Sequence, residues 1–440
     1  MEEEFHNHMR IPWHDYTRKS LGHPITEASL SEKASIIGRT GIMLLSCGTG
    51  AWRVRSSMNT LARELGITCT ADIGLLSIEY TCIAGGDCYT ESLCLFNTGV
   101  NTSKLYRMEL FVNKFATNCK KMSGDELHTL LDQIHEIHGF YSPPFLGLAA
   151  AVACCAFTFL LGGGPIEMFC AFLGAGAGNY LRAKMNQHHL TLFLCTAASV
   201  ALACVVYTIS FMALKSGFDV SIHHQAGYIC SMLFIIPGFP FITSGIDLAK
   251  LDMRSGLERL TYAIIIIAVA TLTAWMLALV LHLKPMDFLP LGLNKFQYLI
   301  FRLIGSFFGV LGFSVMFNSP LRLAATAGLI GAIANTTRLE LVDLASFPPA
   351  AAAFLGALLA GLLASMIKTS IGYPRISLTV PSIVIMIPGL YLYRAIYNIG
   401  ITSINTGAYW FTEAFLIIMA LPLGLIFARI ITDKTFRQCS

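Results

Sequence analysis

A series of ten long apolar stretches from residue 145 onward constrains the fold of this chain more than any other feature. A helix that crosses a lipid bilayer needs about 20 predominantly apolar residues. With 55% hydrophobic and 13% charged residues, the 440-residue chain is neither disordered nor an ordinary soluble globule. The sequence therefore predicts an α-helical integral membrane protein with about ten transmembrane helices, at 145–164, 167–181, 190–213, 228–246, 260–283, 296–317, 320–337, 348–367, 377–394 and 409–430.

The lysines and arginines between these spans favour one orientation. If the N-terminus lies inside, the inner connections and the tail hold eleven of these residues and the outer connections hold five. Positive residues accumulate on the cytoplasmic side of membrane proteins. The N-terminus is acidic and lacks the apolar core of a signal peptide. We therefore expect both termini in the cytoplasm, including the tail 433–440.

The membrane part repeats itself. Two Pro-Gly segments, IIPGF at 235–239 and MIPGL at 386–390, stand 151 positions apart, and the other predicted spans fall on one another with the same shift. Because each half has five spans, an odd number, the second half enters the membrane upside down. Inverted repeats of this kind are typical of secondary transporters. The sequence predicts two inverted five-helix repeats, 144–290 and 291–432, of which the second and seventh spans are short and rich in Gly and Ala.

The Pro-Gly pairs are predicted to interrupt the fourth helix of each repeat. Proline removes a backbone donor and disturbs the preceding turn, whereas glycine lets the chain open. The freed backbone groups cannot face lipid, so they face protein or a water-filled cavity, where they can bind a polar solute. A simple kink is the alternative. The candidate substrate-binding residues are those of the two breaks, a small pair after the first break, and one asparagine in each Asn-x-x-Arg segment: Pro237, Gly238, Ser244, Gly245, Asn179, Asn335, Pro388 and Gly389.

Few charged residues occur inside the spans, and each is costly there, so function is the default explanation. Asp247 follows the first break, while Glu167 and Glu413 lie toward the outer side, and Arg302 lies in the sixth span. The alternative for Glu167, Glu413 and Arg302 is an interfacial side chain that reaches water. A proton-coupled carrier needs a group that changes charge, and burial favours the neutral form of a carboxyl. We expect Asp247 to be the first candidate for proton coupling, followed by Glu167 and Glu413.

The first third of the chain has soluble composition. After a polar tail at 1–26, residues 27–143 predict a compact α/β domain, expected in the cytoplasm, with two helices, two β-rich stretches (71–85 and 88–100) around the Gly85-Gly86-Asp87 turn, and two further helices. No GxSxG, P-loop or HExxH motif is present, so we expect no enzyme.

Metal and cofactor sites are not expected. The thirteen cysteines show no CxxC spacing, which argues against zinc and against a disulfide framework. His128, His135 and His138 share one helix face, where they could form a metal or proton site or could simply be solvated. A nucleic-acid partner is not expected either, since there is no basic stripe.

Four segments together resemble the threonine/serine exporter (ThrE) family: LLSCGTGAWRVRSSMNTLARELG, NTSKLYRMELFVNKF, IIPGFPFITSGIDLAKLDMRSGLERL and YPRISLTVPSIVIMIPGLYLYRAIYN. The resemblance covers nearly everything after Ser29. It implies proton-driven export of threonine- or serine-like amino acids across the bacterial inner membrane. The family includes two-chain versions (YjjP/YjjB-like) implied to export dicarboxylates such as succinate, and this sequence looks like both chains fused. One departure is Ser244-Gly245, where the family usually has a pair such as Asn-Gly, which leaves the substrate open.

Two other function classes stay open. A passive channel needs a continuous polar pore, against which the scarcity of charges and the paired breaks argue. A membrane-tethered hydrolase needs far fewer spans and a catalytic triad. The expected partners are therefore a small-molecule substrate, protons and the lipid bilayer, together with a possible second copy of the chain.

Overall fold

The computed structural model describes residues 11–17, 22–137, 139–218, 221–284, 286–401 and 403–437. The chain forms two compact units. The small unit comprises Met1–Gly139 and Asp247–Arg259, and the helical unit comprises Phe140–Ile246 and Leu260–Ser440. The division differs from the expected one because a short segment of the first repeat, residues 247–259, folds with the N-terminal residues.

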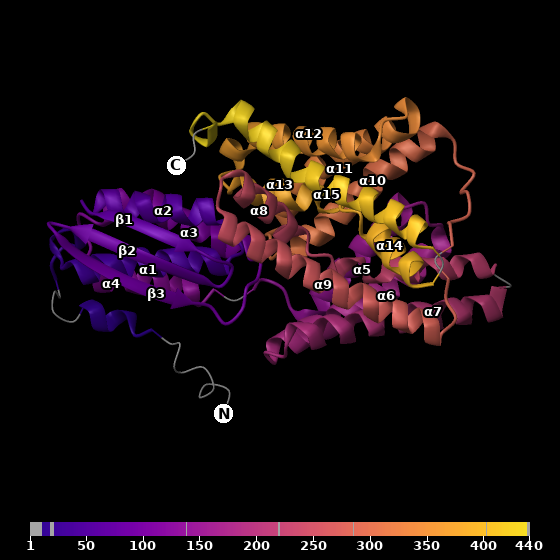
Figure 1. Ribbon diagram of the computed structural model, residues 1–440, viewed down its shortest axis with the longest axis horizontal. Coiled ribbons are helices and arrows are strands. Elements are labelled where there is room, and N and C mark those ends of the chain that lie inside the picture. Colours follow the sequence, from indigo (N-terminus) through magenta and orange to yellow (C-terminus); the bar gives the residue numbers. More distant parts are fainter. Residues whose placement is uncertain are drawn as a thin grey trace. The chain divides into compact units, whose positions relative to one another are not determined.

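The small unit is a three-stranded antiparallel sheet covered by helices (Figure 1). Its strands follow one another in the order β1-β2-β3. The expected pair of β-rich stretches contains three strands, because the first stretch holds the end of β1 as well as β2. The elements are η2 (Trp13–Thr17), η3 (Ile25–Glu27), α1 (Leu30–Ser46), α2 (Ala51–Glu64), β1 (Thr68–Ile73), β2 (Ser77–Ala84), β3 (Asp87–Cys94), α3 (Thr102–Asn118) and α4 (Gly124–His135).

Local sequence signals explain these boundaries. Gly85 and Gly86 connect β2 to β3 with φ of 60° and 95°, which only glycine adopts readily. Ser29 caps α1 by accepting from the Glu32 amide, and Ser123 forms a capping box at α4. Along β2 the side chains alternate, and those of one face are buried against α1. The core of the small unit therefore lies between one face of the sheet and its helices.

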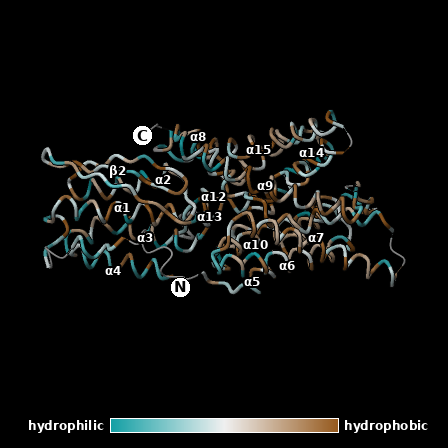
Figure 2. The backbone as a smooth tube through the Cα atoms, turned by 60° about the horizontal axis from the view of Figure 1, so that its bottom comes forward, coloured by the Kyte–Doolittle hydropathy of each residue, from teal (hydrophilic) through white to brown (hydrophobic). Residues whose placement is uncertain are grey.

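The helical unit contains a helix or a bent helix pair in each predicted span. These are α5 (Pro143–Leu160), α6 (Pro165–Gln187), α7 (Leu192–Phe218), η4 (Ile222–Ile235) with α8 (Gly238–Ala249), α9 (Met253–Val280), α10 (Lys295–Met316), α11 (Leu321–Ala345), α12 (Pro349–Ile371), α13 (Arg375–Val384) with α14 (Gly389–Ile401), and α15 (Ile404–Thr432). A short 3-10 turn, η5 (Thr435–Arg437), follows. Apolar residues run along α7 and α10, whereas α4 of the small unit carries hydrophilic ones (Figure 2).

Among the described helices, fewer than the ten expected are both long and apolar enough to cross a membrane. Six of the described helices are long and apolar enough to cross a membrane, or up to eight spans if each bent pair counts as one. Helices α6 and α11 are not among them, because glycine and polar residues lower their hydropathy. Crossing by ten helices therefore stays a prediction.

The first three helices of each half and the segment before each break have the same neighbours in the two halves of the helical unit. In the first half α5 packs on α6, α6 on α7, and η4 on α5, α6 and α7; in the second half α10 packs on α11, α11 on α12, and α13 on α10, α11 and α12. Helices α5 and α10 also contact each other. This agreement is what a structural repeat predicts.

The register between the halves varies along the chain. The breaks stand 151 positions apart, as expected, but α6 and α11 begin at Pro165 and Leu321, which are 156 positions apart. In this second register Asn179 corresponds to Asn335. The two Asn-x-x-Arg segments are thus equivalent in position.

Candidate functional site

Both Pro-Gly pairs interrupt a helix at equivalent places. The η4–α8 pair bends by 55° and the α13–α14 pair by 47°. Three backbone hydrogen bonds recur at each break with the same spacing. They are Ile236 N to Leu233 O (3.2 Å), Gly238 N to Ile236 O (2.8 Å) and Phe241 N to Pro237 O (3.2 Å) in the first half, and Ile387 N to Val384 O (3.2 Å), Gly389 N to Ile387 O (2.9 Å) and Leu392 N to Pro388 O (3.0 Å) in the second.

The two breaks also contact each other reciprocally. A Cβ atom on Gly238 would overlap the Val384 side chain and lie 2.8 Å from Ile387 Cδ1. A Cβ atom on Gly389 would overlap Ile236 and lie 3.1 Å from Leu233 Cδ2. Glycine is therefore needed at both positions, because side chains of one break approach the backbone of the other closely. The contact is the same in both directions, as a pseudo-two-fold axis requires.

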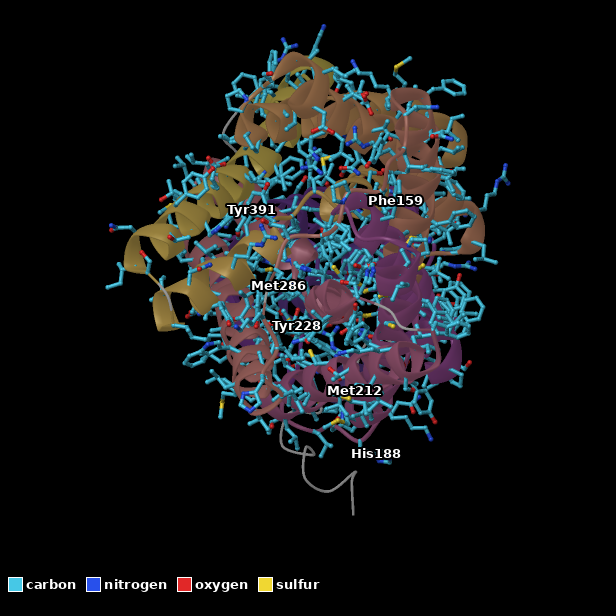
Figure 3. The ribbon with its side chains drawn as sticks, turned by 90° about the vertical axis from the view of Figure 1, so that its right-hand side faces the viewer. Phe159, His188, Met212, Tyr228, Met286 and Tyr391 are labelled. Carbon is cyan, nitrogen blue, oxygen red and sulfur yellow. The ribbon has the colours of Figure 1, made fainter. Side chains whose placement is uncertain are left out.

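A tyrosine pair lies beside the breaks. The hydroxyls of Tyr228 in η4 and Tyr393 in α14 are hydrogen-bonded, and their rings meet edge-on with centroids 5.8 Å apart. Figure 3 shows Tyr228 and Tyr391 inside the helical unit, whereas Met212, which is 56% exposed, lies at its periphery. Sequence reasoning missed this pair, because tyrosine in an apolar helix is common and nothing local marks it.

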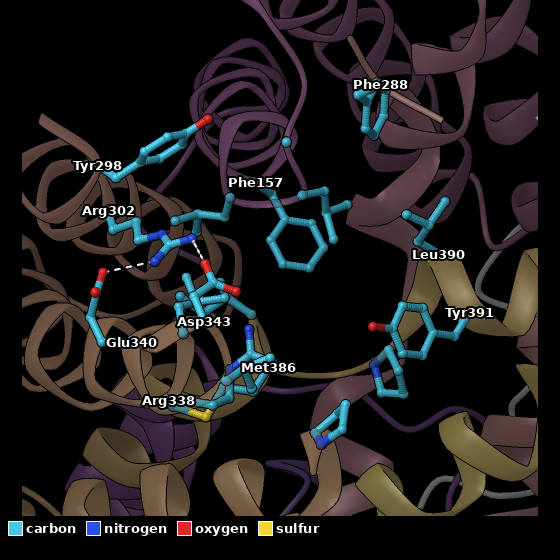
Figure 4. A pocket seen from close by; sticks show the side chains of 18 of the residues that line it. Phe157, Phe288, Tyr298, Arg302, Arg338, Glu340, Asp343, Met386, Leu390 and Tyr391 are labelled. Carbon is cyan, nitrogen blue, oxygen red and sulfur yellow. Dashed lines mark hydrogen bonds and ion pairs between the residues drawn. The ribbon is translucent and has the colours of Figure 1, made fainter. Parts of the chain in front are cut away.

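A cavity of about 740 Å³ lies next to the second break (Figure 4). Residues 385–388 form one part of its wall, together with Tyr391 and side chains from α5, α10, α11 and α15. Its charged lining residues are Asp287, Lys295, Arg302, Arg338, Glu340, Asp343 and Arg394. The volume is within the range of small-molecule sites.

Most of these charges are paired. Arg302 donates to Glu340 (2.7 Å) and to Asp343, which the dashed lines in Figure 4 mark. Arg394 donates to Asp287 (2.8 Å). For Arg302 the sequence left open an interfacial side chain that reaches water, but the side chain is only 14% exposed and lies in this wall.

The predicted residue Asn335 positions another cation of the cavity. Asn335 is fully buried; its amide donates to Ser306 Oγ (2.9 Å), and its Oδ1 accepts from Arg338 Nε (2.9 Å). Glu413 lies on the α15 face that carries Trp410 and Ile417, both of which line the cavity, and it interacts electrostatically with Tyr391. Pro388 thus lines the cavity, while Asn335 and Glu413 lie next to residues that line it.

The predicted residues of the first half do not join this cavity. Asn179 donates to the Leu146 carbonyl (2.8 Å), which ties α6 to α5. Ser244 donates to the Phe241 carbonyl (2.8 Å) within α8. Gly245 lets α15 approach, since a Cβ atom there would lie 2.5 Å from Pro422 Cγ.

Glu167 has two partners of its own. Its side chain is 1% exposed; one oxygen accepts from the Gly164 amide (3.0 Å) at the start of α6, and the other pairs with His224 Nδ1 (2.6 Å). Because both oxygens are engaged, Glu167 fixes the entry of α6 against η4.

Asp247 belongs to the small unit and is fully buried there. Its Oδ2 accepts from the Ala51 amide (3.2 Å) and from Ser255 Oγ (2.9 Å), and it lies 3.3 Å from Arg259 Nε. The N-cap of α2 is Gly50, which has no side chain, so the Asp247 carboxylate takes the place of the cap.

Arg259 completes this contact. Its guanidinium donates to the carbonyls of Gly48 (3.3 Å) and Thr49 (2.8 Å), in the loop before α2. Further along the same segment, Asp252 pairs with Arg55, and Glu258 accepts from the Leu75 amide (2.6 Å). The segment 247–259 is therefore fixed to the rest of the small unit by several polar contacts, which the sequence did not reveal.

The histidines of α4 do not share one environment, since His128 is buried whereas His135 is exposed. His128 is fully buried, its Nε2 hydrogen-bonds with Ser35 Oγ (3.0 Å), and burial lowers its pKa to about 3. Partial burial also lowers the pKa of His135, while His138 lies outside the described residues. Among the described residues no group of three or more His, Cys, Asp or Glu side chains could hold a metal ion. The described cysteines are free.

Two family models match the chain. The model described as "Putative threonine/serine exporter" matches residues 35–282, and the one described as "Threonine/Serine exporter, ThrE" matches residues 302–431. The first covers most of the small unit and most of residues 144–290, and the second covers most of residues 291–432.

Individual relatives fall into two groups. A "Probable threonine/serine exporter" of Mycobacterium tuberculosis is 22% identical over 409 residues, which cover 90% of this chain and 75% of the relative. The "Probable succinate transporter subunit YjjP" of Escherichia coli is 26% identical over 244 residues, 53% of this chain and 91% of the relative. The subunit of the same name from Klebsiella aerogenes is 25% identical over 244 residues, 53% of this chain and 90% of the relative. No solved structure matches the chain.

Proposed function

Since this chain belongs to the threonine/serine exporter family, we propose that it is a secondary active exporter of small polar metabolites, with threonine- and serine-like amino acids as substrates. The family is one of transporters and not of enzymes, and the apolar helices make the chain a multi-pass membrane protein. The similarity to the Mycobacterium tuberculosis exporter over 90% of this chain supports this substrate class.

The observation that carries the proposal is the pair of reciprocal breaks with a cavity beside one of them. Interrupted helices that meet at a repeat interface are the usual place of substrate binding in transporters, and alternating access moves one repeat against the other. Equivalent packing in the two halves supports an inverted repeat of five plus five helices. In this proposal the protein lies in the bacterial inner membrane with both termini in the cytoplasm, as the distribution of Lys and Arg suggests.

Proton coupling needs a carboxyl that can exchange its proton, and the contacts favour one of the three candidates. Asp247 is paired with Arg259, and Glu167 is bonded to Gly164 and His224. Glu413 instead lies one helical turn from Trp410 and Ile417, the two α15 residues that line the cavity. We therefore rank Glu413 before Asp247 and Glu167 as the proton-coupling residue.

Counterflow in proteoliposomes tests the proposal. Vesicles that contain the purified full chain and are loaded with unlabelled threonine, serine or succinate should transiently accumulate external labelled substrate. A carrier gives this overshoot because it exchanges substrate for substrate, whereas a passive channel or a tethered hydrolase gives none. If no substrate produces an overshoot at normal protein abundance, the assignment as a carrier fails.

A second arm tests the driving force. An imposed pH gradient should drive transport by the wild type, and Glu413→Gln should lose this response but retain counterflow, because exchange requires no net proton movement. If Glu413→Gln keeps the full response to the gradient, Glu413 is not the coupling group, and Asp247→Asn and Glu167→Gln are measured in the same way.

A dicarboxylate exporter is the second candidate. The similarity to two succinate transporter subunits over 53% of this chain favours it. Succinate counterflow that exceeds threonine and serine counterflow at equal concentration would replace the first substrate class by the second.

A further inference from the structure

We infer that Arg338 binds the carboxylate group of the transported solute in the cavity beside the second break. The inference rests on the proposed transport function and names the residue and the chemical group through which this site recognises its substrate. A carboxylate is common to hydroxy amino acids and to dicarboxylates, so the inference applies to both.

The pairing of charges in the cavity wall singles out Arg338. Arg302 has two carboxylate partners and Arg394 has one. Lys295 is exposed to solvent at the first residue of α10. Arg338 is half-buried, and within the described part of the chain no carboxylate forms an ion pair with it. Asp343 acts on Arg338 electrostatically but is bonded to Arg302, so among the described residues Arg338 has no ion pair of its own and is suited to take a carboxylate from a ligand.

The guanidinium is held in a fixed position. Asn335 Oδ1 accepts from Nε, and Asn335 is itself anchored to Ser306 of α10. With Nε engaged, the two terminal nitrogens of Arg338 stay available for the bidentate geometry in which arginine binds carboxylates. Because these bonds exist before a ligand arrives, little side-chain entropy is lost on binding.

The surroundings of Arg338 suit a small zwitterion or diacid. The Met386 sulfur and the Arg338 Cβ both approach Gly356, so the arginine stands next to the residues that precede Pro388. Tyr391 points its hydroxyl into the same open space in Figure 4. A ligand carboxylate on Arg338 thus lies beside the break, while Glu413, near Tyr391, is a partner for a second, positively charged group.

The test compares carboxylates with their uncharged amides. The purified full chain is assayed by counterflow and by thermal unfolding with threonine, threoninamide, succinate and succinamide. Loss of a charge-assisted bidentate contact weakens binding by about 10- to 100-fold, so Arg338→Gln should raise the KM for threonine or succinate by this factor. Arg338→Lys keeps the positive charge but not the bidentate guanidinium, so its KM should lie between those of the wild type and Arg338→Gln.

Arg322→Gln is the matched control, because Arg322 lies on the same helix, is exposed and does not line the cavity. It should keep the wild-type KM. In Arg338→Gln the preference for threonine over threoninamide should also disappear, and so should the stabilisation by threonine and succinate in thermal unfolding. If Arg338→Gln misfolds, its melting temperature without ligand will be lower than that of the wild type. In that case Arg338→Lys takes its place in the test.

The possible failures are distinguishable. A wild-type KM and a wild-type preference for the carboxylate in Arg338→Gln would overturn the inference and leave the carrier intact. Stabilisation of the wild type by threonine or succinate that Arg338→Gln abolishes, without any counterflow, would support the inference and refute the carrier. Absence of both stabilisation and counterflow in the wild type would refute both.

Discussion

The two halves of the helical unit carry the same motif in the same register, but only the second makes a polar site from it. Asn335 connects Ser306 to Arg338, whereas Asn179 bonds to the Leu146 carbonyl. The difference comes from the neighbouring helix. Asn335 meets a serine side chain of α10, whereas Asn179 meets only a backbone carbonyl of α5.

The same register explains why the charges gather in one half. Glu340 and Asp343 of α11 correspond to Lys184 and Gln187 of α6, and α5, the counterpart of α10, contains no arginine. The first half therefore lacks the two carboxylates and the arginine that line the cavity of the second. The comparison teaches that the two halves share the breaks, while the charged wall of the cavity comes mainly from the second half.

The largest expected difference between the halves concerns the helices after the breaks. Asp247 of α8 and Asn398 of α14 are equivalent in the 151-residue register, but only Asp247 pairs with a buried arginine of the small unit. Removing one partner of a buried ion pair costs about 3–5 kcal/mol, because the other charge stays buried and uncompensated. Asp247→Asn should therefore destabilise the small unit strongly.

Chemical denaturation of the full chain, followed through a fluorescent label on an exposed residue of the small unit such as Cys88, measures this effect. Asn398→Ala, the equivalent change, should leave that transition in place. If Asp247→Asn unfolds at the wild-type denaturant concentration, the ion pair does not stabilise the unit, and a role of Asp247 in proton coupling gains support.

The breaks should behave alike. Gly238→Ala and Gly389→Ala each place a Cβ atom into the opposite break, and overpacking of this kind costs about 1–3 kcal/mol. Both variants should lower the melting temperature and the counterflow rate to a similar extent. Gly217→Ala is the control, since nothing lies within 4 Å of a Cβ atom there. A strong effect at one break and none at the other would contradict their equivalence.

The smallest expected effect separates the two asparagines. Asn179→Ala removes a helix–helix hydrogen bond and should cost about 1 kcal/mol of stability while the KM stays unchanged. Asn335→Ala should cost about the same in stability but raise the KM for a carboxylate substrate, because Arg338 loses its support. Melting temperatures and KM values of the two variants measured side by side decide the point; equal KM values would mean that both asparagines only pack helices.

Much of the local structure could be predicted from the sequence. The length of the apolar stretches and the turn residues between them predicted the helices of the helical unit, and the Pro-Gly pairs predicted both breaks. The capping signals at Ser29 and Ser123 located helix starts in the small unit. The strand β1 was partly missed because its short run of residues at 68–73 begins only three residues after α2 ends.

The site could be predicted only in part. Pro388 lines the cavity and Asn335 and Glu413 lie next to residues that line it, but Asn179 and Ser244 make bonds to nearby backbone carbonyls instead. Arg338 could be recognised in the sequence as part of the Asn-x-x-Arg motif. Whether it has an ion-pair partner depends on which acids pair with which arginines across α10, α11 and α14. Such pairing is a matter of distance in space and leaves no trace in spacing along the chain.

The sequence by itself determined that this protein crosses a membrane, where its helices lie and where two of them break, because helix length, hydropathy and the chemistry of Pro-Gly act over a few residues. Only the tertiary structure decided that Asp247 caps a helix 196 positions away, that the breaks press against each other, and that one Asn-x-x-Arg segment supports a cavity while the other joins two helices. The reason is physical: a polar side chain buried among helices bonds to whatever group packing brings within about 3 Å, and that group comes from a distant part of the chain.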